Sequence, residues 1–358
     1  SNTLRHGGPL PEGPRWILTN SKMNHFIEVI TVSKAKTDVD KVFKQLGYHN
    51  LTPMHKSVNP VSRFIIKLCG VARILTSVHR GDNLCLQYPM KKFYHLACTL
   101  AHLKGAKVIT IVHDLDAFRR KKITAERERY LFNKTDALIV HNPTMLQYMK
   151  GEQFQGRLYN LQIFDFITEA VPKQYVAPHT PWRVVYTSNL RRWRNEFIYH
   201  LDEVMHNWNI VLFGPGYEDA GAQKPGVTYM GKLPEEKLIC SVEGDFGLVW
   251  DGDSFDECAG DWGEYLKINN PHKTSLYLRA GIPVIVWKKA ALAPFITENQ
   301  LGIAVDSIRD LDQALADLTP TAYAAMKANA LEMSEKLGDG FFEKKAFTTA
   351  TADLEKAR

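Results

Sequence analysis

The sequence contains no long apolar run, since no stretch approaches the roughly 20 apolar residues that a membrane-spanning helix needs. Its 358 residues include five cysteines, an odd number with no Cys-x-x-Cys pair. This pattern argues against a disulfide framework and against a zinc site, and it fits a reducing compartment.

The first 22 residues also lack the apolar core of a signal peptide. Because the regular pattern begins only after Met23, we interpret residues 1–22 as an expression remnant or disordered lead, and Met23 as the native start. We expect the protein to be cytoplasmic, either free or peripheral on the inner face of the membrane.

What is present is an ordinary globular composition, with 45% hydrophobic and 23% charged residues and a net charge of +6. The length exceeds what one hydrophobic core usually organises, so we expect two domains with a cleft between them. The positive charge favours a phosphorylated ligand or an anionic surface, without identifying a partner. We expect no nucleic-acid partner.

Short β-branched runs alternate with helical patterns from Met23 onward, which is typical of a parallel sheet flanked by helices. Prolines at 172, 178 and 181 then interrupt the pattern and mark a linker. After it the same alternation recurs, with no sequence repeat. The expected strands are residues 25–30, 83–88, 107–113 and 137–141, then 183–187, 210–213, 245–250 and 283–287.

This alternation predicts an α/β protein with two Rossmann-like domains that face a central cleft. The first domain spans residues 23–175 and the second spans residues 176–340. Residues 321–358 have a purely helical pattern, and we expect the last part, 341–358, to pack back on the first domain.

The most informative stretch begins at Asn270 and ends at Pro283. Asn270 is a good N-cap, Pro271 suits the first helical position, and Gly281 followed by Pro283 supplies the stop. The free N–H groups then fall near His272 and Lys273.

Lys273 lies at the start of this helix, where its charge opposes the helix dipole unless an anion is bound. The sequence therefore predicts an anion site, although a capped surface helix with a solvated lysine also fits. Upstream, a buried strand ends at Trp250 and Asp251. Because ligands of open α/β sheets lie at the carboxyl ends of strands, Asp251 is a further binding candidate, whereas Trp250 suits the core.

These residues resemble a bacterial family of galactofuranosyltransferases and glucosyltransferases with the GT-B fold. The resemblance covers about residues 23–342, and its most distinctive motif is Asn270-Pro271-His272-Lys273. The other matching segments are Trp250-Asp251-Gly252, 263–267, 280–287, Ser33-Lys34 with Asp38, Gly81-Asp82, and His113-Asp114.

The resemblance implies transfer of glucose or galactofuranose from a UDP-sugar to a saccharide that is lipid-linked or carried by a glycoprotein. It implies that residues 23–175 hold the acceptor and residues 176–340 hold the nucleotide-sugar. It also implies that Arg191 contacts the nucleotide or its diphosphate, as a guanidinium can do with two parallel hydrogen bonds. Ser33 and Lys34, just after the first strand, are expected to line the acceptor side.

Glycosyl transfer needs cations that stabilise the departing diphosphate and, for inversion, a base for the acceptor hydroxyl. Lys273, Arg191 and the helix terminus can supply the cations, so we expect neither a metal nor another cofactor. Two Asp-x-Asp sequences, at 114–116 and 251–253, match a metal-binding pattern of another transferase fold, and we interpret them as coincidence. Candidate bases are His113, Asp114 and Asp116, with Asp82 a weaker one.

Residues 60–79 form a basic amphipathic pattern with apolar positions at helical spacing and Arg63 and Lys67 on other faces. Core packing is the ordinary use of such a helix, while an anionic membrane or a subunit interface of a homo-oligomer are alternatives. The run 119–122, two arginines and two lysines, could support membrane or acceptor binding.

Three functions remain open at this level. The first is the glycosyltransferase. A UDP-sugar epimerase binds the same ligand in a similar fold without an acceptor, and a non-catalytic partner subunit could keep the fold. The donor sugar, acceptor, linkage and stereochemical outcome are not fixed by the sequence.

Overall fold

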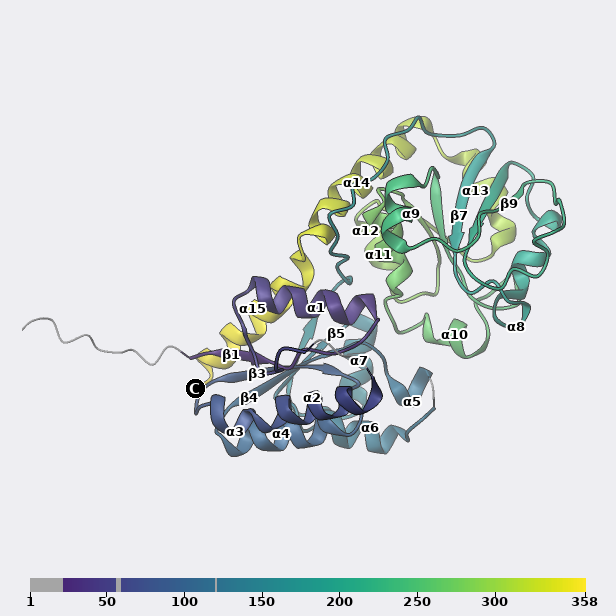
Figure 1. Ribbon diagram of the computed structural model, residues 1–358. Helices are drawn as coiled ribbons and strands as arrows, with labels where there is room; N and C mark the ends of the chain where they lie inside the picture. Colours follow the sequence, from purple (N-terminus) through teal and green to yellow (C-terminus); the bar gives the residue numbers. More distant parts are fainter. Residues whose placement is uncertain (1–21, 56–58, 120) are drawn as a thin grey trace, which may run out of the picture.

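The computed structural model describes residues 22–55, 59–119 and 121–358. The interpretation of residues 1–22 as a remnant or disordered lead therefore falls almost entirely outside the described residues. Within these ranges the chain forms two six-stranded sheets, each with all strands parallel (Figure 1). This agrees with the predicted α/β architecture.

The first sheet has the strand order β2-β1-β3-β4-β5-β6. Its central strands are continuous buried apolar runs, as expected for parallel strands covered on both faces. The strands are β1 (Asn24–Phe26), β2 (His49–Asn50), β3 (Asn83–Tyr88), β4 (Lys107–Val112), β5 (Ala137–Val140) and β6 (Arg157–Asn160).

The second sheet has the order β12-β11-β10-β7-β8-β9. No helix or strand occurs between the two sheets, from residue 161 to residue 181. The strands are β7 (Trp182–Thr187), β8 (Trp208–Phe213), β9 (Val227–Tyr229), β10 (Phe246–Val249), β11 (Val284–Trp287) and β12 (Gly302–Val305).

The helices connect the strands and cover both faces of each sheet (Figure 1). Those before β7 are α1 (Lys34–Gln45), α2 (Pro60–Ala72), α3 (Ile74–Ser77), α4 (Phe93–Leu103), α5 (Asp116–Arg119), α6 (Ala125–Phe132) and α7 (Pro143–Gly151). Those after β7 are α8 (Arg192–Asn195), α9 (Glu235–Ser241), α10 (Gly260–Tyr265), α11 (His272–Arg279), α12 (Ala293–Glu298), α13 (Leu311–Asp317), α14 (Pro320–Gly338) and α15 (Phe341–Lys356), with 3-10 turns at Glu196–Tyr199, Leu201–Glu203 and Ile308–Asp310.

Three predicted elements differ from the structure. The first strand ends at Phe26, not at residue 30, so the segment after it is free to turn toward the cleft. The pattern over residues 60–79 is two helices, α2 and α3, that meet at Arg73. The final helix is also broken, because Gly340 adopts φ 70°, a left-handed conformation that ends α14 and starts α15.

The last helix crosses back to the first domain. Figure 1 shows α15 beside α1 on one face of the first sheet, while α2, α3 and α4 cover the opposite face. Phe347 of α15 packs edge-on against Phe43 of α1, with ring centroids 4.7 Å apart. The preceding helix, α14, packs instead on α11 of the second domain.

Candidate active site

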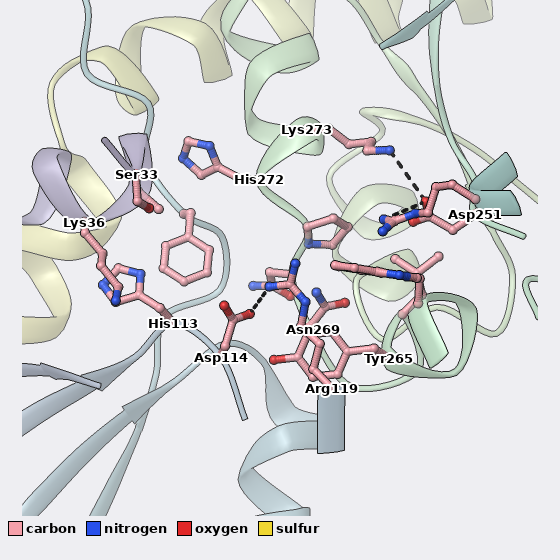
Figure 2. Close-up of a pocket in the computed structure, with 17 residues that line it drawn as sticks. Ser33, Lys36, His113, Asp114, Arg119, Asp251, Tyr265, Asn269, His272 and Lys273 are labelled. Carbon is pink, nitrogen blue, oxygen red and sulfur yellow. Dashed lines mark hydrogen bonds and ion pairs between the residues drawn. The ribbon is translucent and has the colours of Figure 1, made fainter. Parts of the chain in front are cut away.

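A cavity of about 270 Å³ lies between the domains, where the carboxyl ends of both sheets meet (Figure 2). The first domain contributes the segment after β1 and the ends of β4 and α5. The second contributes α10, the start of α11 and the end of β10. The lining residues are Ser33, Ala35, Lys36, His113, Asp114, Arg119, Phe164, Arg194, Asp251, Trp262, Tyr265, Leu266, Asn269, Asn270, Pro271, His272 and Lys273.

Lys273 lies at the topological switch point of the second sheet. The chain runs from β7 outward to β8 and β9 and then returns to β10 on the other side of β7. The Lys273 ammonium donates to Ser188 Oγ at 3.1 Å, just after β7, and lies 3.9 Å from Asp251 Oδ1, just after β10. Only 17% of the lysine side chain is exposed, and burial lowers its pKa. A cation thus occupies the crevice where ligands of such sheets bind.

The expected N-cap at Asn270 is wrong. Helix α11 begins at His272 with Pro271 in the cap position, and no side chain caps it. The Asn270 amide is used across the domain junction instead, because its Nδ2 donates to the carbonyls of His141 and Gln162 at 2.7 and 2.9 Å. Its Oδ1 accepts from Asn142 Nδ2 at 2.9 Å. Asn270 therefore fixes the helix start relative to the first domain.

The arginine that faces the cavity is Arg194, not Arg191. Arg191 is exposed, lies outside the lining and hydrogen-bonds Asn189 in its own loop. Arg194, one helical turn further on, donates to Asp251 Oδ1 at 3.3 Å. The predicted contact of Arg191 with the diphosphate stays a prediction, while the geometry of α8 directs Arg194, from the same arginine cluster, into the cavity.

Two arginines from different domains stack on Trp262 of α10. The Arg119 guanidinium lies 4.2 Å from the ring centroid and the Arg194 guanidinium lies 3.4 Å from it. Arg119 also donates to Asp114 Oδ1 at 2.6 Å, as the dashed line in Figure 2 shows. A continuous contact chain therefore crosses the cleft from Asp114 to Asp251.

Both of these arginines keep a buried Nε–H without a hydrogen-bond partner among the described residues. A buried donor without an acceptor costs free energy. These two Nε–H groups therefore indicate that a further acceptor binds in the cavity. Burial lowers the pKa of Arg194, and the like charge of Arg119 adds to that effect. The pair is therefore arranged to receive an anion in the cavity.

His113 ends β4 and presents an unusual buried imidazole. Its Nε2 is 2.6 Å from Gln87 Oε1, an acceptor, so Nε2 carries the proton. The Gln87 amide is oriented in turn by its Nε2 donating to Asp40 Oδ1 at 2.8 Å. Nδ1 of His113 is buried without a partner among the described residues. Burial, with the positive charge of Lys36 nearby, holds the pKa of His113 well below its usual value, so the ring is neutral with Nδ1 as a free acceptor.

His272 also lines the cavity, on the same wall as Phe166. The two rings stack with centroids 5.2 Å apart, and burial lowers the pKa of His272 to about 4. The imidazole is therefore neutral at pH 7. Figure 2 places Ser33 near it, on the first-domain wall with Lys36 and His113.

Three other predicted residues lie outside the lining. The Lys34 ammonium is held by the Asp38 carboxylate and the Ile167 carbonyl, behind α1. Asp116 starts α5, where its backbone N–H donates to Glu128 at 2.7 Å. Asp82 precedes β3 and pairs with His25 at 2.9 Å, at the edge of the sheet away from the cleft.

No cluster of three or more His, Cys, Asp or Glu side chains suited to a metal ion occurs among residues 22–55, 59–119 and 121–358. In the same ranges no helix is long and apolar enough to cross a membrane. Of the second Asp-x-Asp sequence, only Asp251 faces the cavity, and it is already in contact with Arg194 and Lys273.

The residues missed by sequence reasoning are mainly those of α10 and α5. The hydroxyl of Tyr265 accepts the Leu115 backbone N–H at 3.0 Å, and this hydrogen bond links α10 to the first domain. Arg119 and Trp262 are more than 140 positions apart. The only signals were the basic run 119–122 and the place of Trp262 just before the family-like segment 263–267. Their pairing depends on how the two domains meet.

Solved structures of low sequence identity share this arrangement. The sucrose-phosphate synthase of Thermosynechococcus elongatus matches with a TM-score of 0.59 at 12% identity, covering 94% of this chain and all of the other. The lipopolysaccharide outer core galactosyltransferase WaaB matches with a TM-score of 0.57 at 11% identity, covering 93% and 99%. Two parallel sheets that face one cleft, together with these neighbours, define the GT-B fold.

The chain belongs to the glucosyltransferase 3-like family. The model of the family's N-terminal domain matches residues 16–163, and that of its C-terminal domain matches residues 184–350. The β-1,6-galactofuranosyltransferase WbbI of Escherichia coli K12 is 31% identical over 81% of this chain and 86% of its own length. Glucosyltransferase 3 of Streptococcus gordonii is 26% identical over 89% and 94%. The predicted resemblance and the transferase activity are thereby confirmed over the epimerase and partner-subunit alternatives.

Proposed function

We propose that the protein transfers a hexose, glucose or galactofuranose, from a UDP-sugar to a hydroxyl group of a saccharide acceptor. The names of the two relatives, a galactofuranosyltransferase and a glucosyltransferase, support the choice of sugars. The donor would lie against the second domain and the acceptor against the first. Such a reaction serves the synthesis of cell-surface polysaccharide, O-antigen or glycoprotein.

The observation that carries this proposal is the partly buried Lys273 at the switch point of the second sheet. Arg194 and Arg119 face the same cavity, each with a buried N–H group that has no partner in the part of the chain that the structure describes. Three cations around one small cavity suit the two phosphates of a nucleotide diphosphate. Asp251, which contacts Lys273 and Arg194, holds their charges in place until the donor arrives.

In the reaction the bond from the anomeric carbon to the β-phosphate oxygen breaks, and a bond to the acceptor oxygen forms. UDP leaves with the bonding electron pair, and its new negative charge develops beside Lys273 and the arginines. We assign the acceptor proton to His113 Nδ1, because this atom is unprotonated and has no partner among residues 22–55, 59–119 and 121–358. Asp114 is the alternative base, although Arg119 already holds its carboxylate.

We also propose that these cations take the place of a metal ion, and that the enzyme works in the cytoplasm. All five cysteines are free thiols, which supports a reducing compartment. The metal proposal is tested by adding a chelator to the transfer reaction. An unchanged rate is expected, and loss of activity restored by a divalent cation would contradict it.

The donor site is tested by titrating UDP into the wild type and Lys273→Ala by calorimetry. Removing a charge that faces the diphosphate in a partly buried cavity should weaken UDP binding about 100-fold. Lys288→Ala is the matched control, since Lys288 is 62% exposed and pairs with Asp306 in the same domain. Equal UDP affinity in Lys273→Ala and Lys288→Ala would show that the assigned site is wrong.

The choice of donor sugar is tested by offering UDP-glucose and UDP-galactofuranose with lipid-linked or peptide-linked saccharides. Product formation that requires an acceptor is expected with one of the two donors. Interconversion of UDP-sugars without any acceptor would instead identify an epimerase.

A further inference from the structure

A second, smaller cavity lies beside the active-site cavity, on the first domain. Its volume is about 140 Å³, roughly the space of a few water molecules. It is bounded by the segment after β1, the segment after β3, and the inner side of α2. The lining residues are Ile27, Glu28, Val29, Ile30, Thr31, Lys36, Arg63, Lys67, Pro89, Met90 and Lys91.

This cavity lies at the topological switch point of the first sheet. The chain leaves β1 through α1 to reach β2 on one side, and returns through α2 and α3 to β3 on the other side. Helices α1 and α2 therefore cover opposite faces of the sheet, as Figure 1 shows. Crevices of this kind, outside the carboxyl ends of two diverging strands, are where open α/β sheets bind ligands.

The walls of the cavity carry four cationic side chains and one carboxylate. The carboxylate belongs to Glu28 and is already engaged, since it accepts from Lys44 at 2.7 Å and from Asn50 at 2.8 Å. Within the described part of the chain, no carboxylate lies within ion-pair distance of Lys67 or Lys91. Four cationic side chains thus line the cavity together with a single carboxylate that is already paired.

Lys67 shows the electrostatic cost of this arrangement. Burial lowers the pKa of Lys67, and the like charges of Lys91 and Arg63 lower it further. Mutual repulsion of cations around a cavity is relieved when an anion enters it.

The two cavities share one wall. Lys36, in the first turn of α1, lines both the small cavity and the active-site cavity. In Figure 2 it lies next to Ser33 and His113. A ligand held in the small cavity can therefore extend past Lys36 toward the proposed base.

Helix α2 directs charged side chains toward the cavity and apolar side chains toward solvent, the reverse of the usual arrangement. Arg63 and Lys67 point to the cavity and are partly buried, whereas Val61, Phe64, Ile65 and Leu68 face solvent with 69%, 49%, 52% and 44% of their surface exposed. These four residues form the apolar face of α2. The expectation that the helix uses its apolar side for core packing is wrong for this face, because only Gly70 and Val71 of α2 are fully buried.

We propose that the small cavity binds the phosphate or diphosphate of an acceptor that is linked to a lipid. The saccharide then extends past Lys36 into the cleft, and the lipid lies along the apolar face of α2. This inference rests on the proposed function and specifies the acceptor class for the same enzyme. Helix α2 thus presents cations to a phosphate on one side and apolar side chains to a lipid on another. A neutral, water-soluble acceptor would use neither.

The test titrates decyl phosphate and decyl glucoside into the protein saturated with UDP, by calorimetry. The wild type is expected to bind decyl phosphate at least about tenfold more tightly, the value of one charge-assisted hydrogen bond. Lys67→Ala and the exposed Lys91→Ala should each lose about tenfold in affinity for decyl phosphate and keep the affinity for decyl glucoside. Lys150→Ala, on the exposed side of α7, is the control and should match the wild type.

Equal affinity for the two decyl compounds, or equal losses for both in Lys67→Ala and Lys91→Ala, would overturn the phosphate assignment. The UDP titration that precedes each experiment reports the donor site separately. A protein that fails to bind UDP but still selects decyl phosphate would refute the proposed donor and leave the cavity assignment standing.

The apolar face is tested with Ile65→Ser. Weaker binding of decyl phosphate, with unchanged binding of inorganic phosphate, is expected if the chain lies along α2. A bulk lipid headgroup is the competing source of phosphate. Vesicles of phosphatidylcholine with phosphatidylglycerol that fail to displace decyl phosphate support the acceptor assignment, whereas displacement by them would overturn it.

Discussion

The carboxyl ends of the two sheets face the same cleft but differ in how their cations are paired. At the edge of the second sheet, Lys273 and Arg194 share Asp251. At the edge of the first sheet, Lys67 and Lys91 have no carboxylate within reach in the described part of the chain. The first arrangement keeps a site intact while it is empty, and the second leaves a net positive field that attracts an anion from a distance.

The two sides of the cleft also carry different groups for the proposed reaction. His113 and Asp114 belong to the first domain, whereas Lys273, where the leaving charge is proposed to develop, belongs to the second. The stack of Arg119, Trp262 and Arg194 joins the two sides inside the cavity, and Asn270 and Tyr265 also contact the first domain. A substitution can therefore impair the groups of one domain without those of the other, and the variants below test each domain in turn.

The largest effect is expected on the first-domain side, from His113→Gln. Loss of the base should lower kcat by about 10²- to 10⁴-fold, while UDP affinity stays at the wild-type value because the donor lies on the other domain. Steady-state kinetics together with UDP calorimetry measure the two quantities. Asp114→Asn is the paired variant, and a loss of that size in Asp114→Asn with an active His113→Gln would transfer the role to Asp114.

A smaller effect is expected on the second-domain side, from Arg194→Ala. One charge-assisted contact to a diphosphate is worth roughly tenfold or more in UDP affinity. Arg191→Ala is the matched control, since it removes the same charge three positions earlier on an exposed side chain. Calorimetry that finds Arg191→Ala to be the more damaging variant would restore the assignment made from the sequence.

The smallest effect is expected behind the cleft, where carboxylates outnumber cations. The Glu343 carboxylate is fully buried without a hydrogen-bond partner among the described residues, and the pKa of Glu343 is raised by burial and by Asp165 and Asp38. Burial also raises the pKa of Asp165 to about 8. Both acids bind protons more tightly in the folded state than in the unfolded state.

Stability from these groups is therefore fully present below about pH 4 and is lost as the pH rises, through about pH 8 for Asp165, by up to about 1.4 kcal/mol per pH unit for each group. Glu343→Gln should raise the melting temperature at pH 8 and flatten its decline between pH 5 and pH 8. Thermal melts across this range measure both. Glu335→Gln, an exposed carboxylate on α14, should leave the curve unchanged, and an equal effect from it would contradict the explanation.

Sequence reasoning succeeded where local pattern and chain topology suffice. Runs of apolar residues predicted most central strands. The rule that ligands lie at carboxyl ends selected Asp251 and His113, the helix-start pattern selected Lys273, and all three line one cavity. These inferences need only the order of elements along the chain.

It failed where the outcome depends on side-chain direction or on how the domains meet. Arg191 and Arg194 have the same chemistry, and only the geometry of α8 decides which one faces inward. Asn270 had every property of a cap, yet contacts with His141 and Gln162 of the first domain outweighed that local preference. The apolar face of α2 shows that a helical period alone does not say which side is buried.

The return of α15 to the first domain has a mechanical consequence. The chain passes between the domains twice, once through the segment before β7 and once at Gly340, and the two crossings are joined by the Phe166 N–H donating to the Leu337 carbonyl at 3.1 Å. Because the two chain crossings lie side by side, the two domains move most easily by rotation about the line that passes through the crossings. Opening the cleft is then a swing about this axis, so the sheet edges farthest from it travel most and the buried carboxylates beside it stay nearly still.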